Sequence, residues 1–390
     1  MISLSIKKCV AGLSVLGFIG AVQAADPIRI GFLGTLSGSL AGMGQDQYDG
    51  FMLALAQKHN VLGGRPVEMF REDDELKPDV GLQAAQKLIE EDKVDIVTGV
   101  SYSNVMMAIH KPITDAKVFL IGSASGPSPM AGASCSPYFF STSWQNDQMS
   151  EAIAQYANQK KYEHIYAIGT NFQGWKDALA GFKRAYTGQV VRDVATQMNQ
   201  PDYSAEIAQI AAFKPDAVFA SYSGGMGVKF IKQYQQAGLL NKIPLVVVAT
   251  VDGLTLPALG QSAMGVMTAQ TWSPDLKNPQ NQQFVAAFEA RYHRIPSNFA
   301  AQSYDAAQLL DSAIAQVKGN INDKAAFRKA LQAADFKSVR GEFAFNTNQF
   351  PIEDFHLLEV GLDSKGRVSM IDKGVLLTNH KDAFYQQCKM

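Results

Sequence analysis

Three loops rich in glycine and serine hold the residues of this chain that are best suited to bind a small anion. They are Gly34–Gly44, Gly99–Asn104 and Gly122–Pro127, and each follows a short apolar run typical of a buried strand. Small side chains let main-chain N–H groups approach a carboxylate, and serine hydroxyls add further donors. One such loop is explained equally well as a turn. Three loops at successive strand ends favour a binding cleft along one edge of a parallel sheet.

Motifs for the common catalytic chemistries are incomplete. Gly42–Gly44 and Gly225–Gly227 lack the third glycine of a dinucleotide-binding loop, and no Walker-type Gly-Lys-Ser/Thr occurs. Gly122–Gly126 has Ala124 where a serine hydrolase carries its nucleophile. The six histidines are scattered without metal-site spacing, and the acidic run Glu72–Glu75 is typical of a solvated loop and helix cap. The sequence therefore suggests no enzyme, no cofactor and no metal site.

Alternating strands and helices must position the three loops. Ile28–Leu33 predicts a strand, the apolar spacing that follows predicts a helix, and Pro66–Phe70 predicts a second strand, which together form a βαβ unit. Gly225–Gly227 repeats the pattern of Gly42–Gly44 before a helix, which predicts two similar lobes. Further strands are predicted at Val94–Thr98, Lys117–Ile121, His164–Gly169, Asp216–Ala220, Pro244–Ala249 and Gly341–Phe345, and a hairpin is predicted from Phe355–Leu362 and Arg367–Lys373.

The first 24 residues have the pattern of a signal peptide. Lys7 and Lys8 precede an apolar run that ends at Val22, and small residues lead to a cleavage point before Ala25. The run is too short for a membrane anchor, and Cys9 precedes it, which is a poor position for lipidation. We therefore expect export to the periplasm. Loss of the two lysines takes the formal net charge from −1 to −3, which gives no reason to expect a nucleic-acid partner.

Two cysteines and about 365 residues remain after cleavage, enough for two domains. In an oxidising compartment an even pair is more often bridged than free, so Cys135 and Cys388 predict a disulfide between the middle of the chain and its C-terminus. Two separate thiols are the alternative.

The order and spacing of these features resemble the type I periplasmic solute-binding proteins, the leucine/isoleucine/valine-binding group of ABC importer receptors. The resemblance covers most of the mature chain and is carried by Gly34–Gly44, Gly50, Gly63–Arg65, Asp73 and Asp74 with Pro78, Lys87–Ile89, and Val94–Gly99 with the loops that follow. It implies an α/β fold with two Rossmann-like lobes joined by a three-segment hinge. Lobe 1 would comprise residues 25–141 and 271–348, and lobe 2 residues 142–270 and 349–390.

The resemblance also implies a function: an extracytoplasmic substrate-binding protein that closes around a ligand and delivers it, as a monomer, to the permease of an ABC transporter. Its first lobe would hold a ligand carboxylate through Ser103 or Asn104 and through main-chain N–H groups of Ala124, Ser125 and Gly126. The family often has threonine at the last of these positions, so one hydroxyl is missing here.

The second lobe and the remaining walls are expected to be soft and aromatic. Asp252 is the candidate partner for a ligand amino group, with capping of the adjacent turn as the alternative. Ser39 and Gln173 are further candidates for contact with the ligand. The other candidate wall residues are Met43, Tyr102, Phe172, Tyr222, Met226 and Trp272, for which core packing or a hinge contact is the alternative. Together with Gly44–Phe51 and Pro127–Trp144, which resemble the aromatic-acid subgroup, they favour a benzoate- or hydroxycinnamate-like ligand. A branched-chain amino acid, or a role as a ligand-sensing receptor subunit, remains the alternative.

Overall fold

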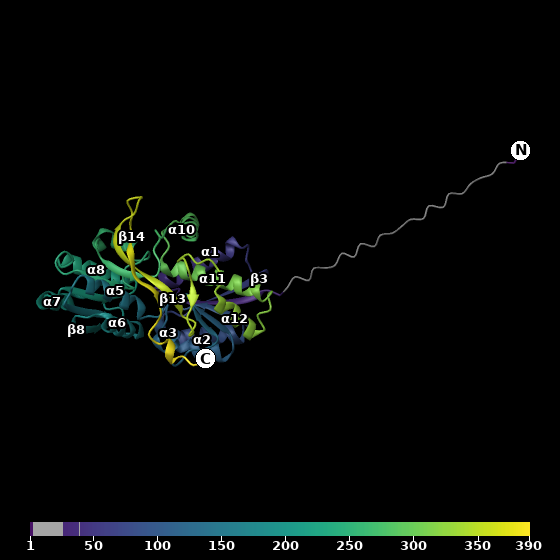
Figure 1. Ribbon diagram of the computed structural model, residues 1–390, viewed down its shortest axis with the longest axis horizontal. Helices are drawn as coiled ribbons and strands as arrows, with labels where there is room; N and C mark the ends of the chain where they lie inside the picture. Colours follow the sequence, from purple (N-terminus) through teal and green to yellow (C-terminus); the bar gives the residue numbers. More distant parts are fainter. Residues whose placement is uncertain (3–25, 39) are drawn as a thin grey trace.

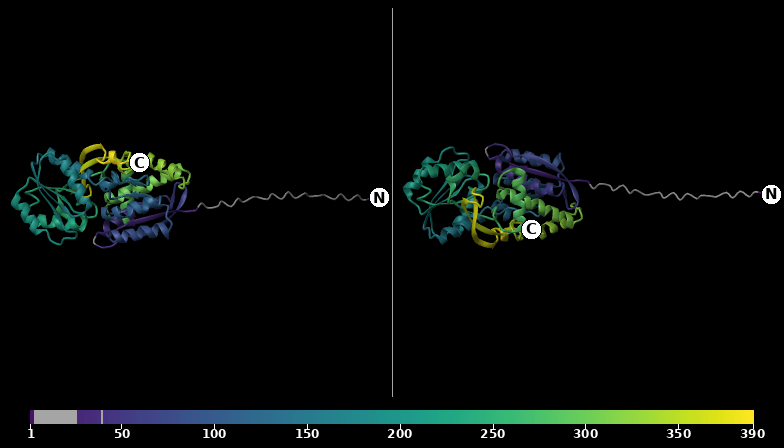
Figure 2. Two further views of the ribbon diagram at one scale, coloured as in Figure 1. Left: turned by 90° about the horizontal axis from the view of Figure 1, so that it is seen from below. Right: turned by 90° about the horizontal axis from the view of Figure 1, so that it is seen from above.

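A computed structural model describes residues 1–2, 26–38 and 40–390 and consists of two α/β lobes placed side by side (Figures 1 and 2). Apart from Met1 and Ile2, the predicted signal peptide lies outside the described residues, and so does Ser39. No helix in the described part of the chain is both long and apolar enough to cross a membrane.

The first lobe is built on a six-stranded sheet of order β2-β3-β1-β4-β5-β6, parallel except for the short β2–β3 pair. The strands are β1 (Ile28–Gly34), β2 (Val61–Leu62), β3 (Arg65–Asp73), β4 (Ile96–Gly99), β5 (Phe119–Gly122) and β6 (Phe139–Ser141). β4 and β5 are buried along their whole length, because helices cover both faces of the sheet. The carboxyl ends of β1, β4 and β5 carry the three glycine- and serine-rich loops to one edge, as predicted.

The second lobe is built on an eight-stranded sheet of order β12-β13-β11-β10-β9-β7-β8, with β14 paired to β13. The strands are β7 (His164–Thr170), β8 (Gln189–Thr196), β9 (Ala217–Ser221), β10 (Leu245–Val248), β11 (Met267–Gln270), β12 (Ala344–Phe345), β13 (Pro351–Leu362) and β14 (Val368–His380). β7 to β11 are parallel, and β13 and β14 form the predicted antiparallel hairpin.

Helices pack on both faces of each sheet. Those of the first lobe are α1 (Ala41–Gln57), α2 (Pro78–Glu90), α3 (Ser103–Asp115), α4 (Ser128–Ala131), α10 (Pro279–Tyr292), α11 (Asn298–Gln316) and α12 (Lys324–Ala333). Those of the second lobe are α5 (Gln148–Gln159), α6 (Gln173–Ala185), α7 (Ser204–Phe213), α8 (Gly225–Gln236), α9 (Leu256–Leu259) and the 3₁₀ turn η1 (Gly260–Ala263). α1 and α11 cross closely because Gly50 has no side chain: a Cβ there would lie 2.1 Å from the carbonyl oxygen of Ala300.

The chain passes between the two sheets three times. It leaves the first sheet after β6 and returns after β11 to place Trp272 in the first-lobe core. It leaves again after α12, through β12, which pairs with β13 of the second sheet while Phe345 packs on the first-lobe core. A buried ion cluster lies between the first and third of these segments. Arg340, only 4% exposed, donates from Nε to Asp305 (3.1 Å) and from Nη1 to Glu353 (2.7 Å) and to the carbonyl oxygen of Ser143 (3.5 Å). Burial raises the pKa of Glu353 to about 7, against the opposing effect of the Arg340 charge.

The C-terminal segment differs from the predicted domain boundary, because residues after β14 lie against the first lobe (Figure 1). Asp382 accepts a hydrogen bond of 3.0 Å from Asn348, and Phe384 packs against the first-lobe core. The predicted disulfide between Cys135 and Cys388 is present and holds the short helix η2 (Tyr385–Gln387) beside α4. Residues 381–390 are thus not part of the second lobe: they form a further connection between the lobes, closed by a covalent bond.

Candidate ligand-binding cleft

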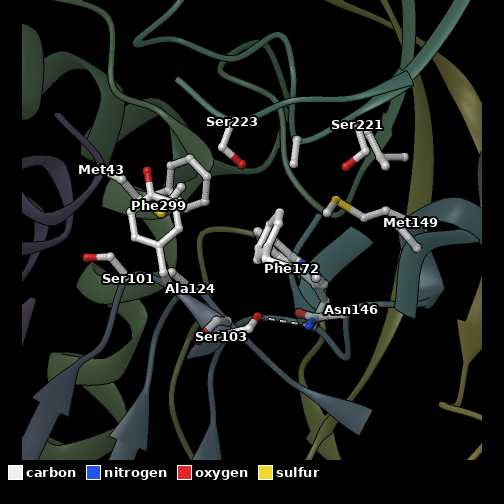
Figure 3. Close-up of a pocket in the computed structure, with 17 residues that line it drawn as sticks. Met43, Ser101, Ser103, Ala124, Asn146, Met149, Phe172, Ser221, Ser223 and Phe299 are labelled. Atoms are coloured by element: carbon white, nitrogen blue, oxygen red, sulfur yellow. Dashed lines mark hydrogen bonds between the residues drawn. The ribbon is translucent and has the colours of Figure 1, made fainter. Parts of the chain in front are cut away.

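A cavity of about 60 Å³ lies between the carboxyl ends of the strands of the two lobes (Figure 3). It is lined by Met43, Ser101, Tyr102, Ser103, Ala124, Ser125, Trp144, Asn146, Met149, Phe172, Gly174, Ala178, Ser221, Ser223, Val248, Ala249 and Phe299. None of these 17 residues carries a formal charge. Leu40, Met43, Tyr102 and Ala124 of the first lobe pack into the apolar cluster of the second, so the cleft is closed.

The first-lobe wall presents unused hydrogen-bond donors. The first backbone hydrogen bond of α3 runs from Met106 to the carbonyl of Tyr102, which leaves the N–H groups of the first helical residues, Ser103 onward, without a partner inside the helix. The Ser125 hydroxyl is buried and has no hydrogen-bond partner among the described residues. A carboxylate oxygen at this wall would meet both the N-terminus of α3 and neutral hydroxyl donors.

The second-lobe wall presents two hydroxyls across the cavity from the donors of the first-lobe wall (Figure 3). Ser221 ends β9 and Ser223 precedes α8, and no hydrogen bond within the described chain engages either hydroxyl. Between the two walls lies a belt of apolar side chains: Met43, Tyr102, Trp144, Met149, Phe172 and Phe299. The rings of Trp144 and Phe299 lie 6.0 Å apart at a tilt of 46°. The cavity therefore combines an apolar middle with hydroxyls at both ends.

Tyr102 contributes its ring rather than an ionisable group. Its side chain is buried, and its hydroxyl donates over 3.5 Å to the carbonyl oxygen of Leu40. Burial raises the pKa of this hydroxyl above its ordinary value, and the charge of Asp252 raises the pKa further. Among residues 26–38 and 40–390, no group of three or more His, Cys, Asp or Glu side chains is arranged to hold a metal ion.

Six of the residues predicted from the sequence line the cavity: Met43, Tyr102, Ser103, Ala124, Ser125 and Phe172. Three others lie close to it but are directed elsewhere. Asn104 donates to the carbonyl oxygen of Leu76 (3.3 Å), and Gln173 donates to Asp177 (2.8 Å). The N–H of Gly126 is taken by Asn146 Oδ1 at 3.0 Å, so it is not free for a ligand.

Four further predicted residues lie in the hydrophobic cores or in a turn, which are the structural roles given above as the alternatives to ligand binding. Tyr222 is fully buried and packs on Tyr203 and Phe230, because alternation along the strand end turns it away from the cavity that Ser221 and Ser223 face. Met226 Sδ accepts hydrogen bonds from Thr170 and Asn199, and Asp252 Oδ1 caps its turn by accepting from the N–H groups of Leu254 and Thr255. Trp272 lies in the first-lobe core and donates to Asn281.

Sequence reasoning missed several lining residues. Ser221 and Ser223 flank Tyr222 in a loop that the sequence marks, and strand alternation could have selected them. The sequence pattern at Asn146 predicts only that it caps a helix. Trp144 comes from the first chain crossing, Met149 from α5 and Phe299 from α11, and no local pattern marks them.

Two lobes that close on a small uncharged cavity, with the chain crossing between them three times, define a hinged solute-binding protein. The sequence profile of the family described as "Periplasmic binding protein" matches residues 27–367, and the chain belongs to this family.

Solved structures similar to this chain are solute-binding proteins of ABC transporters. One from R. palustris, in complex with benzoate, is 31% identical, with 94% of this chain and 100% of that chain covered and a TM-score of 0.88. Another, from Rhodopseudomonas palustris BisB5 in complex with 3,4-dihydroxy benzoic acid, is 26% identical, with 92% and 99% covered and a TM-score of 0.85. Among curated proteins, the Leu/Ile/Val-binding protein homolog 6 of Brucella melitensis is 26% identical over 372 residues, which cover 92% of this chain and 94% of that protein.

These comparisons confirm the predicted family and fold. The protein is an ABC-type solute-binding protein of the Leu/Ile/Val-binding-protein-like family. Its relatives bind substrates rather than transform them, and solute-binding proteins of ABC importers work with membrane permeases.

Proposed function

We propose that this protein captures a small aromatic carboxylate, of the benzoate or hydroxycinnamate type, in the periplasm and delivers it to the permease of an ABC importer. The observation that carries the proposal is the chemistry of the cavity: apolar and aromatic walls, hydroxyl and main-chain donors, and no charged side chain. The similar proteins crystallised with benzoate and 3,4-dihydroxy benzoic acid support the same ligand class.

The absence of an acid from the lining argues against an amino acid. A bound amino acid would bury its ammonium group, and an unpaired buried charge costs several kcal/mol. Asp252, the candidate partner, does not line the cavity and is occupied by the turn that it caps. A ligand carboxylate meets no such cost, because the N-terminus of α3 and the Ser103 and Ser125 hydroxyls stabilise negative charge.

Closure follows from the same arrangement. The first lobe would bind the carboxylate and the second would cover the ring, so the ligand contributes contacts in the closed form that the open form lacks. The closed lobes would then be the form that the permease recognises. The signal peptide would direct export of the precursor, and the mature protein would act as a monomer.

A branched-chain amino acid is the second candidate, because curated relatives are named Leu/Ile/Val-binding proteins. A ligand-sensing receptor subunit would share the fold. It would differ from a transport protein only in its partner, a signalling protein instead of a permease.

A thermal-shift screen of the mature protein distinguishes the ligand classes. A ligand at a hundredfold excess over its Kd stabilises the folded state by about 2.7 kcal/mol, which raises the Tm measurably. We expect benzoate and 4-hydroxybenzoate to raise the Tm and leucine to leave it unchanged. The matched control is 4-methylpentanoate, which is leucine without its ammonium group: it should shift the Tm more than leucine does. A larger shift with leucine or isoleucine would replace our proposal with the amino-acid alternative.

A further inference from the structure

Asp177 of α6 lies behind the cavity wall, where the two lobes meet. Its side chain is 4% exposed and does not line the cavity. Four hydrogen bonds converge on the carboxylate: from the Ser128 N–H (3.3 Å) and hydroxyl (2.8 Å), from Asn146 Nδ2 (2.9 Å) and from Gln173 Nε2 (2.8 Å). Ser128 belongs to the first lobe and Asp177 to the second, so the carboxylate also joins the closed lobes.

The contacts of Asn146 fix the orientation of its amide. Its Oδ1 accepts the N–H of Gly126 at 3.0 Å, and its Nδ2 donates to Asp177 Oδ2 and, at 3.0 Å, to Ser103 Oγ (Figure 3). A main-chain N–H can only donate, and an ionised carboxylate can only accept. A flipped amide would face a donor with its NH₂ group and an acceptor with its oxygen, so a single orientation satisfies both neighbours.

The fixed amide in turn determines what Ser103 offers to a ligand. Ser103 Oγ accepts from Asn146, and its own hydrogen has no acceptor among the described residues. A hydroxyl has one hydrogen to donate. Because Ser103 lines the cavity at the N-terminus of α3, this hydrogen is available to a ligand oxygen.

We propose that Asp177 is a positioning residue of the ligand site, which orients Asn146 so that Ser103 acts as a donor and thereby makes the site select carboxylates over carboxamides. This inference rests on the proposed function, because it assumes that the ligand carboxylate binds at the first-lobe wall. A carboxylate accepts at both oxygens, whereas the NH₂ of a carboxamide would confront the donors of this wall.

The test compares benzoate with benzamide by isothermal titration calorimetry on the mature protein and on three variants. D177N keeps the shape of the side chain but replaces one acceptor oxygen with a donor, and D177A removes the carboxylate. S128A is the matched control, because it removes an interlobe bond to Asp177 while leaving the bond between Asp177 and Asn146 intact. We expect the wild type to prefer benzoate and both Asp177 variants to reduce this preference at least tenfold. S128A should weaken both ligands by the same factor.

A preference for benzoate that is unchanged in D177N and D177A would overturn the inference and leave Asp177 a structural residue. If the wild type binds neither benzoate nor another aromatic acid, the proposed function fails instead. The positioning of Asn146 is then read directly, by NMR hydrogen exchange of its side-chain amide in the ligand-free protein. Exchange at least tenfold faster in D177N and D177A supports the positioning role, and equal exchange in all three proteins refutes it.

Discussion

Removing the Ser103 and Ser125 hydroxyls one at a time separates their roles in ligand binding from their roles in the fold. A hydrogen bond to a charged group contributes about 2 kcal/mol, so each alanine variant should raise the Kd for benzoate about 30-fold, and the double variant on the order of a thousandfold. The effects on stability should differ. Ser125 Oγ has no partner within the described chain, so S125A should leave the free energy of unfolding unchanged. S103A leaves one of the two hydrogens of Asn146 Nδ2 without its acceptor, while the bond to Asp177 stays, and should lower the free energy of unfolding by about 1 kcal/mol.

Calorimetric titration gives the Kd values, and urea unfolding of the ligand-free proteins gives the stabilities. An S125A variant that binds benzoate as tightly as the wild type would refute the reasoning, because the Ser125 hydroxyl, which is buried and has no partner among the described residues, would then not contact the ligand.

Three further predictions concern the stability of the structure around the cleft. C135S combined with C388S removes the covalent link of the C-terminal segment to the first lobe and should lower the free energy of unfolding by about 4 kcal/mol in non-reducing urea; equal stability would show that the link contributes little. The pKa of Glu353 is about 7 in the fold against an ordinary 4.5, so this group favours folding below pH 4.5 and loses that contribution as the pH rises through 7. E353Q should therefore flatten the pH dependence of stability over this range by about 3 kcal/mol, and a curve parallel to the wild type would contradict the assignment. G126A should destabilise by about 2 kcal/mol in thermal or urea unfolding, because its Cβ would lie 2.1 Å from the carbonyl oxygen of Trp144; a stability equal to the wild type would mean that this loop yields freely.

The central parallel strands β7 and β9 were predictable because they are buried on both faces and appear as continuous apolar runs. β7 and β9 have this character, and the sequence places them to within a residue or two. β8 was missed because it is a partly exposed strand at the sheet edge with polar residues among its valines. The destination of residues 381–390 was also missed, since local pattern does not say which lobe a terminal segment packs against.

The lining of the candidate site was predictable where a loop itself forms the wall of the cavity. Ser103, Ala124 and Ser125 belong to loops whose composition marks them. Tyr222 was misplaced by strand alternation, and Trp272 by a residue type that suits a core as well as a pocket. Residues from distant segments line the cavity only because the two lobes close on each other. The periodicity of a single segment does not predict this closure.

Calorimetric titration of the ligand-free mature protein with benzoate and with leucine, under the same conditions, distinguishes an aromatic carboxylate from an amino acid as the ligand. We expect that benzoate binds and that leucine gives no measurable heat of binding, because the cavity offers donors for a carboxylate and no acid for an ammonium group. Tighter binding of leucine than of benzoate would contradict this expectation.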